Sequence, residues 1–310
     1  MKSIWTMGEM LVEIMRPHEE MPHDVAGEYI GPFPSGAPVI FIDAVTRLGG
    51  NAGIIGGVGN DGFGKNLLTR LVKDGVDCSH VKCCDSGSTA IAFVMYHADG
   101  SREFIFHIAG TPATQGKMPV TPIEDVGFFH IMGCSLTAEE AFCNEIIKTM
   151  HQMKEHGAKI SFDPNIRPEL LKGDIGKIIA PVMENCSVLL PGVDELLMLS
   201  GEKTVEAACA KLYENPVLEV IALKRGSKGA TIITREDSVN VPACKIRQLD
   251  ATGAGDCFDG AFLTALLAGK EHASAGAEAS AAGALNAMAF GPMEGDISPQ
   301  TVAEMIAANR

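Results

Sequence analysis

Positive charge is scarce in this chain. Its 310 residues include 25 lysines and arginines against 39 aspartates and glutamates, a net charge of -14 with histidine neutral. Nucleic-acid binding depends on a basic surface that displaces counterions from the phosphates, and this composition does not supply one. We therefore expect no nucleic-acid partner, and an anionic ligand would have to be held by local donors and a metal cation.

Long apolar runs are also missing, and we expect no secretory leader. No stretch approaches the roughly 20 apolar residues that a membrane span needs. The N-terminus does not combine a basic segment, an apolar core and a small-residue cleavage site. We expect no membrane partner and a cytoplasmic location.

The nine cysteines do not form a metal or redox motif. They are scattered between Cys78 and Cys257, without a Cys-x-x-Cys pair and without the histidine spacing of a zinc site. Cys83 and Cys84 form the one local cluster, and adjacent cysteines are more often incidental than redox-active. We expect buried thiols and no cysteine-bound metal.

The dinucleotide-binding fingerprint is absent from the first strand–helix turn. A dehydrogenase of that class needs Gly-x-Gly-x-x-Gly there. Gly8 is instead followed by Glu9, Met10 and Leu11. The sequence therefore argues against a dinucleotide-dependent dehydrogenase.

What the chain does contain is a regular alternation of short β-rich runs with longer helical patterns. Hydrophobic residues make up 46% of the sequence, ample for a buried core. The alternation predicts an α/β fold with parallel strands joined by crossover helices. The expected core strands are 53–57, 128–132, 159–162, 187–190, 220–223 and 230–234. The expected helices are 38–48, 63–74, 139–156 and 205–214, followed by an alanine-rich helical stretch at 273–289.

Two segments break this pattern and lack a helical period. They are residues 25–34 and 89–107, and the second reads as a β-hairpin of strands 90–96 and 102–106 around a four-residue loop. We expect the two segments to form one small sheet. The alternative is an ordinary antiparallel extension of the core sheet.

Residues 250–256 (Asp-Ala-Thr-Gly-Ala-Gly-Asp) place an acid where an apolar stretch begins. Gly253 and Gly255 allow a tight turn, and the first turn of a helix offers unpaired amide donors to an anion. The carboxylate of Asp256 would repel a phosphate bound at this helix end, so its placement there is unfavourable for stability. A role as the base that deprotonates a substrate hydroxyl explains the placement better. The alternative is a plain helix start with an acid in its first turn.

This run resembles the signature of ribokinase-like (PfkB) carbohydrate kinases. Further matching segments follow in the order that the family shows: 8–13, 34–38, 56–64, 163–167, 191–195 and 224–229. The members it resembles are fructokinases, tagatose kinases and 2-keto-3-deoxygluconate kinases. The resemblance implies a single kinase domain over residues 1–310, with a three-layer α/β/α core, a mainly parallel central sheet and a small β-sheet lid. The lid would comprise about residues 10–35 and 88–110 and would often mediate a homodimer.

The resemblance also implies an ATP-dependent phosphotransfer. Such a reaction needs a base, donors for the transferred phosphoryl group, Mg²⁺ between phosphates and exclusion of water. We expect Asp256 to be the base and the amides of Gly253, Ala254 and Gly255 to form the anion hole.

The nucleotide and metal residues are likewise implied by the resemblance. Glu195 has the acid position of the family's Asn-x-x-Glu motif, although Gly192 replaces the asparagine, and Asp250 belongs to a loop that binds a monovalent cation such as K⁺ in related kinases. The expected nucleotide-binding residues are Asn165, Lys224, Gly226, Ser227, Gly229, Thr252 and Asn286. Each assignment has an alternative. Glu195 would be a solvated helix acid, and Asp250 and Thr252 would only shape a turn. The glycines at 226 and 229 would form a tight hairpin, and Asn286 would be a capped or solvent-facing side chain.

The sugar-binding residues depart from the family pattern. We expect sugar contacts from Glu13, Gly36, Ala37, Phe104, Phe106 and Arg167. Many sugar kinases have Asp at position 13 and Asn at the position of Ile40, which cannot hydrogen-bond a hydroxyl. We favour a ketohexose such as fructose or tagatose. An acid sugar, with Arg102, His107 and Arg167 as carboxylate partners, and a non-catalytic sugar-binding regulator remain alternatives.

Overall fold

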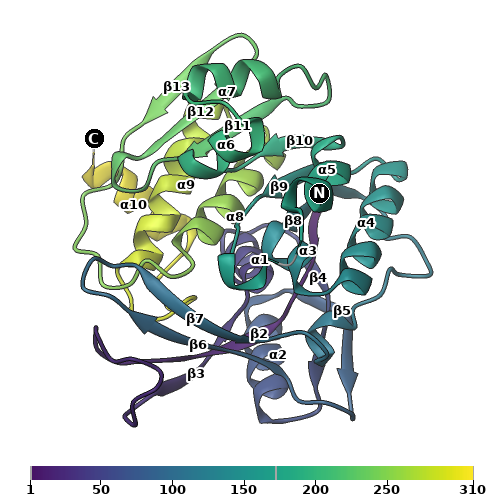
Figure 1. Cartoon of the computed structure of the whole chain (residues 1–310). Coiled ribbons are helices and arrows are strands. Elements are labelled where there is room, and N and C mark those ends of the chain that lie inside the picture. The colour runs from purple at the N-terminus through teal and green to yellow at the C-terminus, as the bar shows by residue number, and fades with distance from the viewer. Residues whose placement is uncertain (1, 172, 310) are drawn as a thin grey trace.

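A nine-stranded, mainly parallel sheet forms the centre of the protein. The structure is a computed structural model that describes residues 2–171 and 173–309 (Figure 1). The strand order is β13-β12-β11-β10-β9-β8-β1-β4-β5, and all neighbours are parallel except at the β11–β12 and β12–β13 pairs. The strands are β1 (Ser3–Met7), β4 (Ala52–Gly59), β5 (Asp77–Cys84), β8 (Val126–Met132), β9 (Lys159–Asp163), β10 (Cys186–Leu189), β11 (Val220–Lys224), β12 (Ala230–Thr234) and β13 (Ser238–Val241).

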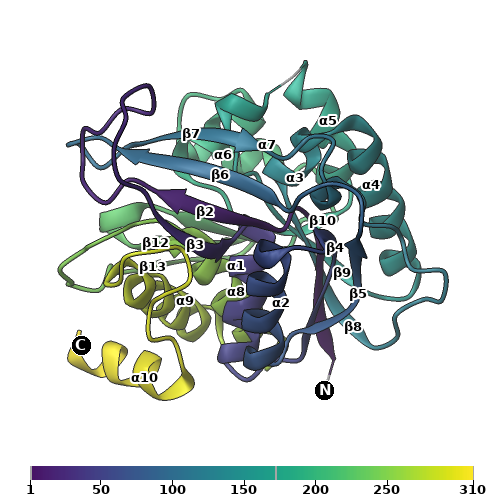
Figure 2. The ribbon, with the colours of Figure 1, turned by 90° about the horizontal axis from the view of Figure 1, so that it is seen from below.

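Helices cover both faces of this sheet, so the core has three layers (Figures 1 and 2). Every residue of β4 and β8 is buried, as expected for parallel strands between two helical layers. One apolar cluster joins the sheet to α1 (Ala37–Arg47), α2 (Gly62–Asp74), α8 (Ala254–Leu267), α9 (His272–Ala287) and α10 (Pro299–Ala308). A second lies on the opposite face and includes residues of α3 (Gly133–Ala138), α4 (Glu140–Glu155), α5 (Ile175–Met183), α6 (Val193–Ser200) and α7 (Val205–Leu212).

The predicted core elements agree with this architecture. All six predicted strands and four predicted helices overlap β4, β8 to β12, α1, α2, α4 and α7, and the alanine-rich stretch is α9. The chain also forms three short 3₁₀ turns, η1 (Pro112–Thr114), η2 (Pro168–Leu170) and η3 (Gly226–Lys228). Among residues 2–171 and 173–309, no helix combines the length and apolarity needed to cross a membrane.

A separate four-stranded sheet, here called the lid sheet, packs beside one end of the core. Its order is β3-β2-β6-β7, with β2 (Leu11–Met15) parallel to β6 (Ala90–Tyr96) and antiparallel to β3 (Ile30–Ser35). β7 (Arg102–His107) forms the predicted hairpin with β6. The small sheet is thus distinct from the core sheet rather than an extension of it.

The chain order positions a site between the two sheets. The carboxyl ends of parallel strands lie at the same edge of a sheet, which is where ligands bind in open α/β folds. The residues that follow β1, β8, β9, β10 and β11 meet at this edge, and the lid sheet faces it (Figure 2). The N-terminus of α8, a helix buried from Asp256 to Leu263, reaches the same edge.

Candidate active site

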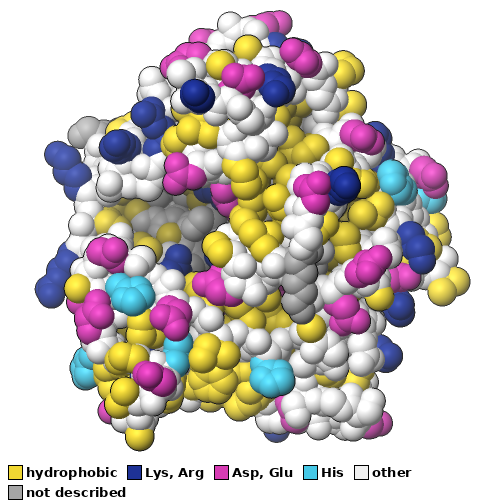
Figure 3. All heavy atoms as spheres, viewed as in Figure 1, with side chains coloured by type: hydrophobic (Ala, Val, Ile, Leu, Met, Phe, Trp, Pro, Cys, Tyr) yellow, Lys and Arg dark blue, Asp and Glu magenta, His cyan; other side chains and the backbone are white. Residues whose placement is uncertain are grey.

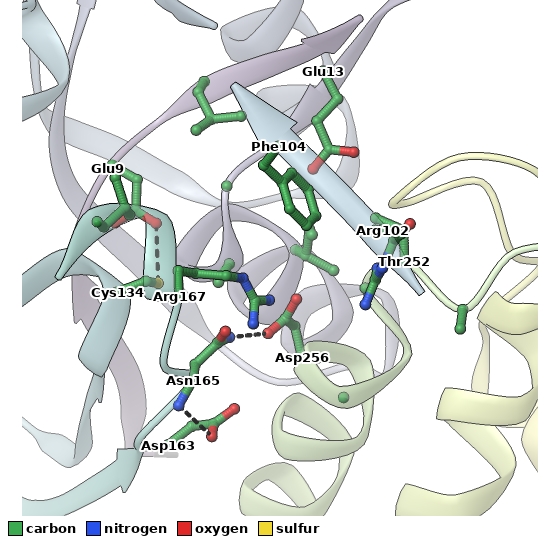
Figure 4. Close-up of a pocket in the computed structure, with 18 of the residues that line it drawn as sticks. Glu9, Glu13, Arg102, Phe104, Cys134, Asp163, Asn165, Arg167, Thr252 and Asp256 are labelled. Carbon is green, nitrogen blue, oxygen red and sulfur yellow. Dashed lines mark hydrogen bonds between the residues drawn. The ribbon is translucent and has the colours of Figure 1, made fainter. Parts of the chain in front are cut away.

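A cavity of about 340 Å³ lies between the lid sheet and the edge of the core sheet. Figure 3 shows a recess on this face of the molecule, and Figure 4 shows the side chains inside the cavity. The predicted site residues in its lining are Glu13, Gly36, Ala37, Phe104, Phe106, Asn165, Arg167, Glu195, Lys224, Gly226, Thr252, Gly253, Gly255 and Asp256. These residues come from seven separate parts of the chain, so the fold brings them together.

Asp256 projects into this cavity from the first turn of α8. The residue is 7% exposed, and Asn165 Nδ2 donates a 3.0 Å hydrogen bond to its Oδ1. In Figure 4 the guanidinium of Arg167 points toward the same carboxylate. Burial raises the pKa of Asp256 to about 7, and nearby Asp163 adds to the rise, while Arg167, Lys224 and Arg102 oppose it. A carboxylate with this pKa can accept a proton near neutral pH.

The loop before α8 has a backbone that only glycine accommodates easily. Gly253 is the N-cap of α8 with φ +75°, and a Cβ there would lie 2.2 Å from the carbonyl oxygen of Pro292. The helix N-terminus carries a partial positive charge and unpaired amides. Gly253 and Gly255 line the first cavity, which puts this helix end where an anion can reach it.

A second cavity, of about 940 Å³, adjoins the first. The two share Lys224, Gly226, Ala251 and Gly255 in their linings. The second cavity is also lined by the predicted residues Ser227, Gly229 and Ala254 and by residues 242–248, which the sequence did not single out. The boundary between the two cavities therefore lies at the N-terminus of α8, beside Asp256.

Asn286 lies elsewhere than expected. Its side chain is fully buried, and Nδ2 donates to the carbonyl oxygens of Thr252 and Pro292 at 2.8 and 2.9 Å. Its Oδ1 accepts from the amide of Gly295 at 3.3 Å. Asn286 lines neither of the two cavities, and its hydrogen bonds brace the loop that precedes α8.

Lys224 links the two cavities through a buried ion cluster. Its Nζ lies 2.7 Å from Asp163 Oδ2 and 3.1 Å from Asp259 Oδ2. Burial alone would lower the pKa of Lys224, but the two carboxylates outweigh it and raise the pKa. Burial also raises the pKa of Asp259, whereas Lys224 holds that of Asp163 low. Asp163 is therefore the charged partner of Lys224.

The two predicted metal residues lie in different surroundings. Glu195 lines the first cavity, and its carboxylate accepts the amides of Gly192 at 2.8 Å and Ile166 at 3.0 Å. Asp250 is 1% exposed and lies outside both cavity linings. In the described part of the chain, no three His, Cys, Asp or Glu residues are grouped as a ready metal site. Glu195 still fits Mg²⁺, which keeps several waters and needs one or two carboxylates beside substrate phosphates.

The lid side of the cavity carries one acid and an aromatic pair. Ser35 Oγ donates to Glu13 Oε1 at 2.7 Å, while the buried Oε2 has no partner among the described residues. Burial raises the pKa of Glu13 to about 7. The rings of Phe104 and Phe106 stack with centroids 5.1 Å apart. An unpaired buried acceptor beside apolar rings suits a ligand that brings hydroxyl groups.

Several site residues were missed by the sequence analysis. Glu9 and Cys134 line the cavity, and Glu9 accepts hydrogen bonds from Ser135 and, at 3.2 Å, from Cys134 Sγ. Asp163 also lines it. Glu9 and Asp163 lie at strand ends within motif segments, and this position could have identified them as site residues. Nothing local marked Cys134 or Asp259.

Comparisons with known proteins agree with this geometry. A family model described as pfkB family carbohydrate kinase matches residues 1–298. Fructokinase-1 of Oryza sativa subsp. japonica is 33% identical over 264 residues, which cover 83% of this chain and 81% of that protein. Fructokinase-2 of Solanum lycopersicum is 31% identical over 269 residues, covering 85% and 81%.

Solved structures extend the likeness to the whole fold. An apo E. coli protein provisionally named ribokinase II has a TM-score of 0.93 and 38% identity, covering 99% of this chain and 100% of that chain. The same E. coli protein with ATP and Mg²⁺ has a TM-score of 0.91 with the same identity and coverage. The chain therefore has the ribokinase-like fold expected from its motifs.

Proposed function

Because the chain belongs to the pfkB family of carbohydrate kinases, we propose that it transfers the γ-phosphoryl group of ATP to a primary hydroxyl of a small sugar. The acceptor we propose is a ketohexose of the fructose or tagatose type. The observation that carries the proposal is Asp256, a buried carboxylate with a pKa of about 7 where two adjoining cavities meet. The curated relatives at 31–33% identity named above are fructokinases.

Asp256 is the proposed general base. Asn165 holds its Oδ1, which leaves Oδ2 to accept the proton of the sugar hydroxyl. The hydroxyl oxygen then bonds to the γ-phosphorus as the bond to the β-phosphate oxygen breaks, giving a sugar phosphate and ADP. The sugar lies in the smaller cavity under the lid sheet, and the nucleotide lies in the larger one.

Charge on the moving phosphoryl group is stabilised from several sides. We propose that the amides at the N-terminus of α8, at Gly253, Ala254 and Gly255, contribute donors where the two cavities meet, and that Arg167, whose guanidinium points toward Asp256 in Figure 4, contributes positive charge. Mg²⁺, when bound, would supply positive charge to the nucleotide phosphates, and Glu195 is the residue that we propose would hold it. Lys224, Ser227 and Gly229 are proposed nucleotide contacts. K⁺ near Asp250 stays a prediction.

A sugar panel tests this function. The panel comprises ketohexoses, pentoses, acid sugars and nucleosides, and a coupled assay with Mg²⁺-ATP measures the ADP released with each. We expect the highest rate of ADP release with a ketohexose. Preference for an acid sugar would instead favour Arg102 and Arg167 as carboxylate partners. A sugar that raises the thermal unfolding midpoint while no panel member yields ADP would indicate a binding regulator, the alternative that Ile40 and Gly192 suggest.

The pH profile of kcat/KM should show a single acidic limb. Asp256 must be ionised to accept a proton, and burial raises its pKa to about 7. We therefore expect kcat/KM to fall about tenfold per pH unit below 7 and to level off above it. Glu13 has a similarly raised pKa, so the profile of Glu13→Gln is the control. Loss of the limb in that variant would assign it to Glu13 and contradict our assignment.

The lid sheet is also the proposed homodimer contact. β7 is an edge strand, and its Ile105 side chain is 48% exposed. An exposed apolar residue on a strand edge favours pairing with a second copy. Sedimentation velocity would show a dimer. We propose a single functional domain over residues 1–310 and a cytoplasmic location on the sequence arguments above.

A further inference from the structure

We propose that Tyr96 is a positioning residue that couples sugar binding under the lid sheet to phosphate binding at the N-terminus of α8. The proposal rests on the kinase function proposed above. It assigns Asp250 the role of connecting the lid to the anion-binding loop. The observations are the hydrogen bonds that cross from the β6–β7 hairpin to residues 250–252.

Two hydrogen bonds, and a longer contact of 3.4 Å between the Tyr96 hydroxyl and Thr252 Oγ1, join the hairpin to this loop. Tyr96, the last residue of β6, donates its hydroxyl to Asp250 Oδ2 at 2.9 Å. Arg102, the first residue of β7, donates from Nη1 to Thr252 Oγ1 at 2.9 Å. Figure 4 shows Arg102 beside Thr252 at the rim of the cavity. The two donors lie on either side of the hairpin turn, so both bonds depend on the position of the lid sheet.

Asp250 connects the Tyr96 hydroxyl to the backbone of the loop. Its Oδ1 accepts the amide of Thr252 at 2.9 Å and the hydroxyl of Thr252 at 2.7 Å. Its Oδ2 also accepts the amide of Gly291 at 3.0 Å. Asp250 is 1% exposed and forms no ion pair with the described residues, so the hydrogen bonds it accepts come from neutral donors. Removing one of those donors leaves a buried acceptor short of a partner.

The other side of the loop is fixed to the core. Asn286, on α9, holds the carbonyl oxygen of Thr252 and that of Pro292. Gly253, the residue after Thr252, is the N-cap of α8 and lines the cavity beside Asp256. The loop that carries the amides at the N-terminus of α8 is therefore bonded to the core through α9 on one side and to the lid sheet on the other. A lid closed over a sugar completes the set of bonds that holds these amides in place.

Reciprocal binding energetics follow from this connection. If sugar favours the closed lid and the closed lid orders the loop, sugar must raise nucleotide affinity, and nucleotide must raise sugar affinity by the same factor. The Tyr96 ring also packs against Phe290 with centroids 6.0 Å apart. A Tyr96→Phe variant keeps that ring and removes the hydroxyl alone.

The test measures this coupling factor by calorimetry. The dissociation constant of Mg²⁺-AMP-PNP is measured with and without saturating D-fructose, or with the panel sugar that most raises the unfolding midpoint. We expect sugar to tighten nucleotide binding in the wild type by a factor within the usual range of about 5–150. Tyr96→Phe should lower that factor by up to about tenfold, toward 1, because the hydrogen bond from the lid to Asp250 is lost.

Tyr29→Phe is the matched control. Tyr29 also lies beside the lid sheet, but its hydroxyl contacts His23 Nδ1 at 3.0 Å and does not reach the loop. The control should keep the wild-type coupling factor. An unchanged factor in Tyr96→Phe, an equal loss in both variants, or no coupling in the wild type would each overturn the proposal. Should Tyr96→Phe fail to fold, Arg102→Gln removes the other crossing bond and the same measurement decides. Because binding alone is measured, this outcome is separate from that of the ADP panel.

Discussion

Replacing Asp256 with asparagine is expected to lower kcat by roughly 10²- to 10⁴-fold, the range for loss of a general base. Asparagine keeps the size of the side chain and can still contact Asn165, but it cannot accept the hydroxyl proton. Affinity for Mg²⁺-AMP-PNP should not fall below the wild-type value, because the substitution removes a negative charge that repels the phosphates. Steady-state ADP release and calorimetry measure the two quantities.

Asp194→Asn is the matched control for this variant. Asp194 also lies in the first turn of a helix, α6, but its side chain is exposed. Its replacement should leave kcat within about twofold, as for most surface substitutions. Turnover retained by Asp256→Asn would remove this carboxylate from the mechanism. The variant should not be less stable at pH 8, since burial disfavours the ionised carboxylate there.

The second large effect concerns stability. Lys224→Met should lower the free energy of unfolding by about 3–5 kcal/mol, because Asp163 would keep a buried charge without its cation. Protonation of Asp259, whose pKa is already raised, would hold the loss toward the lower end. Urea unfolding at pH 7.5 followed by circular dichroism gives the difference.

An exposed ion pair provides the comparison. Lys159 and Glu219 lie 2.6 Å apart, and each side chain is about half exposed. Lys159→Met should cost less than about 1 kcal/mol. Adding Asp163→Asn to Lys224→Met should recover part of the lost stability. If Lys224→Met proved no worse than Lys159→Met, the cluster would not be the structural link described above.

Local patterns explain which parts of the site could be predicted. Asp256 and the glycines before it lie within one seven-residue run, so the turn, the helix start and the acid were visible together. The core strands were visible because strands buried on both faces form continuous apolar runs. The lid hairpin was visible because its two strands are adjacent in the chain.

Contacts between distant segments explain what could not be predicted. Lys224 meets Asp163 and Asp259, which are 61 and 35 residues away in the chain. No periodicity in any of these segments specifies that pairing. Asn286 illustrates a second limit, because an alanine-rich helix gives little indication of which face meets the core. Asn286 braces the loop before α8 because the later segment with Pro292 and Gly295 folds back against α9, and the sequence does not specify that contact.

The two sheets of this enzyme carry residues for two different tasks, acceptor binding and phosphoryl transfer. The residues that would meet the acceptor beneath the lid, Glu13 on β2 and Phe104 on β7, belong to a different sheet from Lys224 on β11 and from β9, which Asn165 follows; those two residues are the ones proposed to contact the nucleotide. Altered side chains in the lid could therefore redirect the enzyme to a new acceptor while the transfer chemistry survives unchanged. Such modularity would let one scaffold acquire new substrates in small, tolerable steps.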